Sequence, residues 1–436
     1  MNKIKIGLLG CGTVGSGVIQ ALEKNKATIA AKVGAELEIT KVLVRDINKK
    51  RDLKNGTISF TCNIDEIIND PEIKIVVEVM GGISPAKEYV LQALKHGKSV
   101  VTANKDLMAL HGKDLFEAAN LGNVDLRFEA SVGGGIPIIG PLKTSLAGNQ
   151  ILKVVGIING TTNYILTKMA KEKSEFNKVL AEAQRLGYAE SDPTADIEGL
   201  DAARKIAILA SIAFNSRVTF PKVYVEGITK ITTRDICYAN ELGYTIKLLG
   251  IAQQNNGTIE VRVHPAFIPN EHPLAKVDDV FNAIYVQGDA VGDAMFYGRG
   301  AGQLPTASAV IGDLMEVARN LTQGIFDKSY CTCFEHKEIK PFREIKTKYY
   351  LRLTVPDRPG VLASIASVFA QHEVSIASVV QKRKTKQAAE LVLITHLVKE
   401  AYLQDALSAI QDLPFVTQIN NVIRVEDLDD EVRVGE

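Results

Sequence analysis

Short apolar, β-branched segments alternate with segments of helical composition over the first 130 residues. The strand-like segments lie at residues 4–9, 37–44, 74–79, 98–102 and 124–128. Strands that alternate with helices form βαβ units, and successive units place their strands in one parallel sheet. The pattern therefore predicts an α/β domain with a parallel sheet over residues 1–130.

After residue 130 this alternation stops, and a Gly-rich stretch leads into helical and strand-like segments without a regular order. The candidate elements are a helix at 201–214 and strands at 222–231 and 258–267. Such a mixture predicts a central α+β domain with a mixed sheet, which would bind substrate and dimerise, over residues 131–299. The helical residues of 300–325 are expected to pack back on the first domain.

The C-terminal part of the chain has a third pattern. Residues 326–345 are charged and aperiodic, which is typical of a linker. The segments that follow read strand, helix, strand, strand, helix and strand, at 347–355, 361–371, 374–381, 388–397, 400–411 and 416–424. This βαββαβ order predicts a ferredoxin-like domain over residues 346–430.

Composition narrows the class of protein. Among 436 residues, 51 are Lys or Arg and 51 are Asp or Glu, so no net charge attracts nucleic acid or an anionic membrane. No apolar run approaches the roughly 20 residues that span a bilayer, and no leader precedes the first strand. Five cysteines are too few for a disulfide framework. We expect a soluble, cytoplasmic protein.

A glycine motif follows the first strand directly and opens a helix. It has the form G-x-G-x-x-G, with glycines at Gly10, Gly12 and Gly15. Such glycines permit a tight turn, let the backbone approach a pyrophosphate and allow close packing of helix on strand. The N-terminus of the helix then offers amide donors to the phosphates. This context predicts a Rossmann-type dinucleotide site rather than an ordinary turn.

The end of the second strand bears on the choice of dinucleotide. A carboxylate at this point hydrogen-bonds the ribose of NAD, whereas an arginine neutralises the 2′-phosphate of NADP. Arg45 comes before Asp46, and basic residues follow at 49–51. We expect NADP, with NAD as the alternative.

Lysine and carboxylate side chains are the candidates for catalysis and substrate binding. Lys105 follows the strand at 98–102, at the sheet edge where ligands of α/β folds bind. Lys205 lies four residues after Asp201 on one helix face, which by itself is typical of a surface ion pair. The preceding turn-rich loop adds Glu190 and Asp192, and carboxylates suit a substrate with a free amino group.

Several of these segments together resemble homoserine dehydrogenases. The resemblance extends over residues 1 to about 325 and is carried by 102–105, 128–137, 156–166, 187–193 and 199–205. It implies reversible NAD(P)H-dependent reduction of L-aspartate 4-semialdehyde to L-homoserine, in threonine and methionine biosynthesis. In the family pattern Lys205 matches the proton donor and acceptor, and Lys105 matches an assisting lysine that also contacts the cofactor. The matching substrate-binding residues are Glu190, Asp196 and Asp201, and the matching nucleotide contacts are Thr13, Val14, Arg45, Gly187 and Gly302.

The same resemblance implies a sodium ion with a structural role. Its ligands would be Glu129 and the carbonyl oxygens of Val132, Gly134 and Ile136. A hard cation prefers such oxygen ligands, and glycines let successive carbonyls converge. A flexible turn between domains is the alternative.

Residues 347–424 resemble an ACT domain, a regulatory module that commonly binds amino acids. Its motif residues Asp357, Pro359 and Gly360 follow a strand and open a helix, whose N-terminus can hold an α-carboxylate. In this family the implied effector is L-threonine, which would inhibit by feedback. The alternative is an ACT domain that serves only for oligomerisation, and either use favours a homodimer or homotetramer.

Three other interpretations of the sequence are possible. Cys331, Cys333 and His336 suggest a metal clip, but a zinc site needs about four ligands, so we interpret them as linker residues. Cys11 is expected only to fit the glycine loop, which speaks against an acyl-enzyme mechanism because that mechanism needs an activated cysteine. The third interpretation is a non-catalytic, NADP-binding regulator with an amino-acid-sensing tail.

Overall fold

The computed structural model describes residues 2–51, 58–326, 331–383 and 388–428. The chain divides into two compact units. Unit 1 comprises Met1–Val154, Arg204–Pro221 and Phe281–His336, and unit 2 comprises Val155–Ala203, Lys222–Val280 and Lys337–Glu436. The finer domain boundaries given above stay a prediction.

Unit 1 contains a six-stranded, all-parallel sheet with the order β3-β2-β1-β4-β5-β6. The strands are β1 (Asn2–Leu9), β2 (Ala35–Leu43), β3 (Ser59–Thr61), β4 (Ile73–Glu78), β5 (Ser99–Thr102) and β6 (Leu126–Arg127). This is the doubly wound Rossmann order, in which ligands bind where the strand order reverses, outside the carboxyl ends of β1 and β4. The predicted parallel sheet is confirmed, and the short strand β3 is an addition to it.

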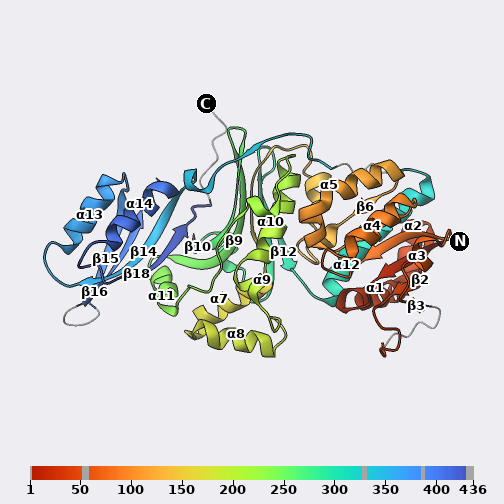
Figure 1. Cartoon of the computed structure of the whole chain (residues 1–436), viewed down its shortest axis with the longest axis horizontal. Helices are drawn as coiled ribbons and strands as arrows, with labels where there is room; N and C mark the ends of the chain where they lie inside the picture. Colours follow the sequence, from red (N-terminus) through yellow and green to blue (C-terminus); the bar gives the residue numbers. More distant parts are fainter. Residues whose placement is uncertain (1, 52–57, 327–330, 384–387, 429–436) are drawn as a thin grey trace. The chain divides into compact units, whose positions relative to one another are not determined.

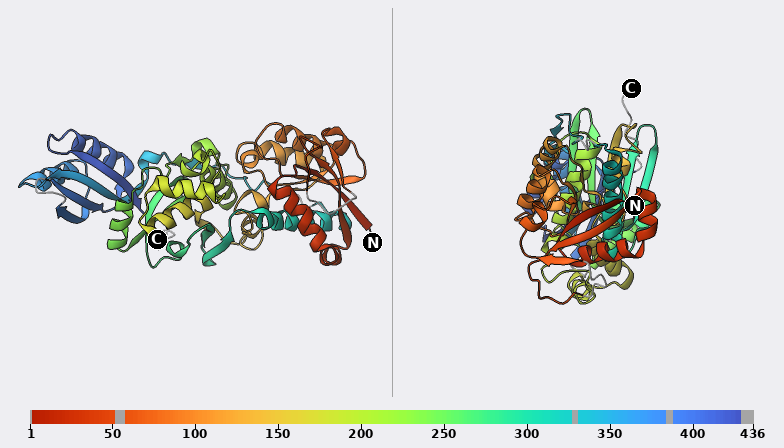
Figure 2. Two further views of the ribbon diagram at one scale, coloured as in Figure 1. Left: turned by 90° about the horizontal axis from the view of Figure 1, so that it is seen from below. Right: turned by 90° about the vertical axis from the view of Figure 1, so that its right-hand side faces the viewer.

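Helices cover both faces of this sheet. The main ones are α1 (Thr13–Lys24), α2 (Lys26–Val33), α4 (Ala86–Lys95), α5 (Lys105–Gly122) and α12 (Gln303–Gln323), and the short helices α3 (Asp65–Ile68) and α6 (Ile139–Lys143) also belong to unit 1. Figure 2 shows α1 and α12 on one face and α4 and α5 on the other. Val18 and Leu22 of α1 share one buried core with Val310 and Leu314 of α12. Residues after 300 therefore complete the core beneath the sheet.

The remaining elements of unit 1 are short or shared. Strands β11 (Phe281–Gly288) and β12 (Gly292–Arg299) form an antiparallel hairpin, and Glu129–Ser131 forms a 3₁₀ turn. Strand β7 (Ile151–Ile157) and helix α10 (Leu200–Ala213) each contribute residues to both units.

Unit 2 is built on a long hairpin of β9 (Tyr244–Asn255) and β10 (Thr258–Pro269). The two loop residues, Asn256 and Gly257, both have positive φ, of 48° and 78°, as a type I′ turn requires. Helices α7 (Gly160–Glu172), α8 (Phe176–Arg185), α9 (Thr194–Ile197) and α11 (Thr233–Glu241) belong to this unit, with 3₁₀ turns at Pro273–Lys276 and Phe342–Glu344 and strand β13 (Glu338–Ile339).

One predicted strand is wrong. Within 222–231 only β8 (Tyr224–Val225) is extended, and it pairs with β10. The chain then leaves the sheet because Gly227 passes close to the end of α9, where a Cβ would lie 2.3 Å from the oxygen of Ile197. The predicted strand at 258–267 is confirmed as β10.

Apart from one added two-residue strand at Val398–Lys399, the C-terminal elements of unit 2 have the predicted βαββαβ order. They are β14 (Lys346–Pro356), α13 (Val361–Gln371), β15 (Ile376–Arg383), β16 (Ala388–Thr395), β17 (Val398–Lys399), α14 (Glu400–Gln411) and β18 (Gln418–Val425). The sheet order β18-β14-β16-β15 is antiparallel, and α13 and α14 cover one face of it (Figure 1). The ferredoxin-like prediction is confirmed.

Strand β18 also pairs in parallel with β10, so the ferredoxin-like sheet continues into that of β9 and β10. Alternate residues of β14 face opposite sides of the sheet. Tyr349 and Leu351 enter the core beneath α13 and α14, whereas Arg352 donates from Nε to Asp235 of α11 over 2.8 Å. Arg352 and Asp235 are both buried, so this ion pair is shielded from solvent.

Among the residues that the structure describes, no helix combines the length and the apolar character that crossing a bilayer demands.

Candidate active site

The glycine loop of unit 1 has the geometry of a phosphate cradle. Gly10 has φ of +100°, and a Cβ there would lie 2.9 Å from the oxygen of Val79. A Cβ on Gly15 would lie 2.2 Å from the oxygen of Gly10, so neither position tolerates a side chain. Gly12 faces open space and no side chain caps α1, whose first residues are Thr13 and Val14. Its N-terminal amides therefore remain as donors for a pyrophosphate.

Gly302 lies next to this cradle although it is almost 300 residues away in the sequence. It precedes α12, has φ of +126° and carries no capping side chain. The adjacent Gln303 donates from Nε2 to Ser16 Oγ of α1 over 3.0 Å. The starts of α1 and α12 therefore lie side by side, which supports the expected nucleotide contact at Gly302.

The turn after β2 presents basic side chains to solvent. Arg45, Lys49 and Lys50 are exposed. Asp46 Oδ1 accepts the backbone N–H of Asn48 over 2.8 Å, so its carboxylate is used in holding the turn. Arg51, which our sequence analysis only grouped with the basic residues, donates from Nη2 to the oxygen of Asp46 over 2.8 Å.

A buried polar network fixes the turn before Lys105. Asn104 caps α5 by accepting the N–H of Leu107 over 3.1 Å, so Lys105 is the first helical residue. Thr102 donates from Oγ1 to Glu78 at the end of β4 over 2.5 Å. Burial raises the pKa of Glu78 above its ordinary value. Sequence analysis missed Glu78, since a carboxylate inside an apolar strand has no periodic signal.

An ion pair joins the starts of the two helices that carry the candidate lysines. Arg204 Nε lies 2.6 Å from Asp106 Oδ1. Asp106 follows Lys105 on α5, and Arg204 precedes Lys205 on α10. The pair therefore sets the spacing between the backbones that bear Lys105 and Lys205.

In unit 2 one amide holds two carboxylates together. Asn159 Nδ2 donates to Asp196 Oδ1 over 2.7 Å and to Asp201 Oδ2 over 2.9 Å. Its Oδ1 accepts the N–H of Thr162 over 2.9 Å and so caps α7. Asp201 is buried, with 5% of its surface exposed, so the surface ion-pair interpretation does not describe it. Asn159 lies in the segment 156–166 that contributes to the family resemblance, and its bridging role is seen only in the fold.

The loop after α8 carries the third expected carboxylate. Gly187 has φ of +77°, and Tyr188 accepts from Thr161 Oγ1 of α7 over 2.6 Å through its backbone oxygen. Glu190 is exposed, while its backbone oxygen accepts from Gln184 Nε2 over 3.2 Å. The structure therefore brings Asp196 and Asp201 to one amide and leaves Glu190 on the loop.

The carboxylate of Glu129, the expected sodium ligand of unit 1, already accepts hydrogen bonds from three backbone N–H groups. Its Oε1 accepts the N–H groups of Ile138 and Ile139 over 2.6 and 2.8 Å, and its Oε2 accepts that of Gly140 over 2.6 Å. These donors form the start of α6. Among the described residues no cluster of three or more His, Cys, Asp and Glu side chains is placed to hold a metal.

The expected effector motif lines a separate hollow of unit 2. Gly360 has φ of +89° and precedes α13, which has no capping side chain. Gln381 donates from Nε2 to Asp357 Oδ1 over 3.0 Å. The cavity, of about 360 Å³, includes Pro359 and Leu391 in its wall. It has room for a small molecule at the free amides of a helix.

Comparison with known proteins covers almost the whole chain. Family models described as "Homoserine dehydrogenase, NAD binding domain", "Homoserine dehydrogenase" and "ACT domain" match residues 10–129, 137–315 and 349–415. The homoserine dehydrogenase of Bacillus subtilis (strain 168) is 45% identical, over 98% of this chain and 99% of the relative. That of Corynebacterium glutamicum is 46% identical, over 98% and 96%.

Comparison with solved structures indicates the same family. A crystal structure of a homoserine dehydrogenase from Thiobacillus denitrificans matches with a TM-score of 0.93 and 45% identity, over 98% of this chain and 99% of that one. A hyperthermophilic archaeal homoserine dehydrogenase in complex with NADPH matches with a TM-score of 0.61 and 26% identity, over 72% and 97%. The chain belongs to the homoserine dehydrogenase family of oxidoreductases and carries its NAD-binding and ACT domains.

Proposed function

We propose that this enzyme reduces L-aspartate 4-semialdehyde to L-homoserine, and catalyses the reverse, with Lys205 handling the proton. The observation that carries the proposal is the arrangement on α10. Asp201, which shares the Asn159 amide with Asp196, lies one helical turn before Lys205. Two carboxylates can bind the ammonium group of the substrate. Lys205 lies on the same helix face, so we expect its amine to reach the reacting oxygen at the other end of so short a substrate.

Each residue has a separate task in this proposal. When bound, the reduced nicotinamide supplies the hydride. Lys205 donates a proton to the forming alkoxide, and in the reverse direction accepts it from the hydroxyl group. Lys105 assists beside it, and the Arg204–Asp106 pair keeps the two lysines in position. Glu190 joins Asp196 and Asp201 in binding the substrate.

Replacing Lys205 tests this assignment. We expect Lys205→Ala to lower turnover by roughly 10²- to 10⁴-fold, the usual contribution of a positioned general acid, while cofactor binding stays unchanged. The matched control is Lys113→Ala, because Lys113 is an exposed lysine of α5 whose amine lies 3.7 Å from Glu117 on the helix surface. Retained turnover in Lys205→Ala would exclude the assignment. Cofactor binding by the unaltered enzyme without homoserine-dependent formation of reduced nicotinamide would favour the non-catalytic regulator.

We infer that NADP is the preferred cofactor and that NAD is the weaker one. The inference is supported by exposed Arg45 at the end of β2, by the use of Asp46 in its own turn, and by NADPH in the archaeal relative. Arg45→Ala is expected to raise the KM for NADP several-fold and leave that for NAD unchanged. An equal effect on both cofactors would contradict the inference.

The cation site is proposed on the resemblance alone. Sodium would bind Glu129 together with the carbonyl oxygens of Val132, Gly134 and Ile136, and its role would be structural. Exchange of Na⁺ for a bulky organic cation at constant ionic strength should then lower thermal stability. No change in stability would support the alternative, in which the amides that contact Glu129 are sufficient.

For the ACT domain we propose feedback inhibition by L-threonine at the cavity beside Gly360. Truncation near residue 340 is a poor test because it would also remove β18 from its partner β10. Asp357→Ala is expected to abolish inhibition and retain turnover, and Asp405→Ala, which alters an exposed carboxylate of α14, is the control. Lack of inhibition in the unaltered enzyme would favour an ACT domain used only for oligomerisation.

We also propose a cytoplasmic homodimer or homotetramer, and light scattering tests the oligomeric state.

A further inference from the structure

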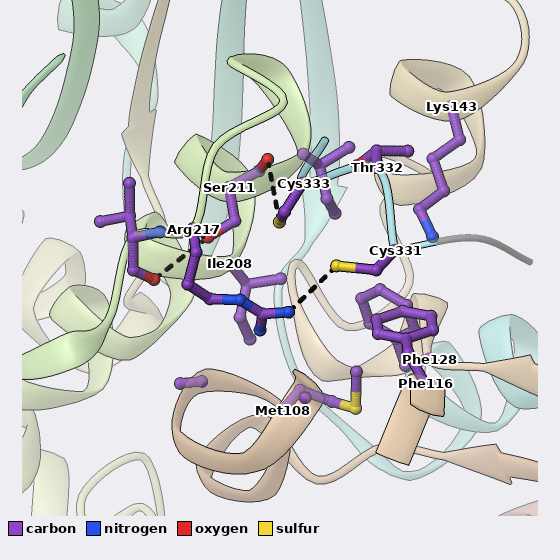
Figure 3. Close-up of a pocket in the computed structure, with 14 residues that line it drawn as sticks. Met108, Phe116, Phe128, Lys143, Ile208, Ser211, Arg217, Cys331, Thr332 and Cys333 are labelled. Carbon is purple, nitrogen blue, oxygen red and sulfur yellow. Dashed lines mark hydrogen bonds between the residues drawn. The ribbon is translucent and has the colours of Figure 1, made fainter. Parts of the chain in front are cut away.

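A small cavity of unit 1 contains two cysteines for which the proposed reaction has no use. Figure 3 shows Cys331 and Cys333 in the wall of this cavity, between α5 and α10. Its volume is about 30 Å³, enough for one or two molecules of the size of water. Aromatic and aliphatic side chains line much of the rest, namely Met108, Phe116, Phe128 and Ile208. Both cysteines, which the sequence alone led us to interpret as linker residues, are half-buried.

The sulfur of Cys331 faces cationic groups. Arg217 donates from Nη2 to Cys331 Sγ over 3.0 Å. Lys143 also lines the cavity, and its amine lies 5.1 Å from the ring centre of Phe116 and 4.8 Å from that of Phe128. Burial lowers the pKa of Lys143 to about 8. Cations beside a sulfur favour its thiolate form.

Further charged groups surround Lys143, and they are of both signs. Arg127 acts on Lys143 as a second cation and Asp313 acts as an anion. Burial raises the pKa of Asp313 to about 7, so this carboxyl is partly neutral near neutral pH. Arg127 is itself paired with Glu316 over 2.9 Å, so Arg217 and Lys143 are the cations that act on the Cys331 sulfur.

Cys333 is placed as a partner for Cys331. Its thiol lies 3.8 Å from the backbone oxygen of Ser211, and its thiol and backbone N–H also contact the Cys331 sulfur. The contact with the Cys333 thiol is the main cause that lowers the pKa of Cys331 to about 5, and Arg217 and Lys143 add to it. The pKa of Cys333 is raised by the same contact and by burial. The contacts thus favour the thiolate form of Cys331 and the protonated form of its neighbour Cys333.

We propose that Cys331 and Cys333 form a redox-modification site, in which Cys331 is oxidised by a peroxide and then forms a disulfide with Cys333. In the first step the Cys331 thiolate attacks one oxygen of hydrogen peroxide. An S–O bond forms, the O–O bond breaks, and the departing hydroxide takes a proton from the Lys143 ammonium to leave as water. In the second step the Cys333 sulfur attacks the sulfenic acid, the S–S bond forms, and the hydroxyl group leaves with the Cys333 proton as water.

The size of the cavity and the spacing of the cysteines support this chemistry. The volume accepts a peroxide of nearly the size of water but no bulky thiol. Residues two positions apart have Cα atoms separated by at most about 7 Å, which is near the upper limit for a disulfide. Because such a disulfide is strained, it should be easily reduced again.

The full-length protein carries its own controls. Cys62 and Cys237 are exposed, so peroxide reaches them freely. After brief treatment with limiting hydrogen peroxide, remaining thiols are alkylated and quantified by peptide mass spectrometry. We expect loss of the Cys331 thiol at least roughly tenfold faster than loss of the two exposed thiols, together with a Cys331–Cys333 disulfide that dithiothreitol reverses.

Four variants separate the steps. Cys333→Ser should stop at the sulfenic acid, which a dione reagent traps, and Cys331→Ser should form no disulfide. Arg217→Gln should slow oxidation of Cys331 several-fold, whereas Arg217→Lys should retain most of the rate because the charge remains. The proposal is overturned if Cys331 in the unaltered protein is oxidised no faster than Cys62 and Cys237, or if its oxidation yields no disulfide with Cys333. These two results need no variant, so a variant that fails to fold leaves the test intact.

Discussion

Replacement of Asn159 separates two roles of one side chain. Its Oδ1 caps α7, and its Nδ2 holds the carboxylates of Asp196 and Asp201. Serine is as good a helix cap as asparagine but lacks the amide donor, whereas alanine lacks both. Asn159→Ser therefore removes the bridge alone, and Asn159→Ala removes the bridge and the cap.

The expected loss follows from the contacts. Each hydrogen bond to a charged group contributes about 1.5–3 kcal/mol. Without the amide, carboxylate oxygens roughly 5 Å apart repel each other by about 3 kcal/mol at an effective dielectric constant near 20. Water replaces part of what is lost, so we expect Asn159→Ser to destabilise unit 2 by about 3 kcal/mol. Asn159→Ala should cost about 1 kcal/mol more, the usual value of a cap.

Urea-induced unfolding followed by circular dichroism measures these differences. The chain contains no Trp, so intrinsic indole fluorescence is not an option. Asp196→Asn is the informative second change, because it removes one of the two charges. The cost of Asn159→Ser in that background should fall by at least about 1 kcal/mol. An Asn159→Ser variant as stable as the unaltered enzyme, or a cost unaffected by Asp196→Asn, would refute this account of the site.

Other contacts give three further predictions. Burial raises the pKa of Asp313 from 3.8 to about 7, so the folded state holds a proton that the unfolded state releases and stability falls as the pH rises through this range. Asp313→Asn should remove about 3 kcal/mol of the fall between pH 5 and pH 8, since about 1.4 kcal/mol per pH unit acts over roughly two units, and urea unfolding at these two pH values would reveal it. Arg204→Met and Asp106→Asn should each lower turnover several-fold and cost at most about 1 kcal/mol of stability, because the pair is partly exposed. The double variant should lose no more turnover than either single variant, since the two side chains act as one unit. Arg352→Met leaves Asp235 buried without its main cation and should destabilise by about 3–5 kcal/mol in calorimetry, whereas a loss below 1 kcal/mol would show that this carboxyl is neutral.

The sequence by itself determined whatever depends on near neighbours in the chain. The glycines at Gly10 and Gly15 indicated the nucleotide loop because backbone clashes leave no other residue there. The order of apolar strand-like runs and helical segments was sufficient for the parallel sheet of 1–130 and for the βαββαβ order, since strands buried on both faces give continuous apolar runs and helices buried on one face give a repeat of 3.6. Where a close approach overrides propensity, as at Gly227, the same reasoning predicted a strand that is mostly a loop.

Only the tertiary structure decided which distant residues meet. Asn159 contacts Asp201 across 42 positions, Thr102 contacts Glu78 across 24, and Arg217 reaches Cys331 across 114. No periodic pattern encodes such pairs, because each depends on how whole elements pack. The buried polar groups that result are costly to leave unpaired, so the fold pairs them, and in doing so it decides which carboxylates, lysines and thiols can act together.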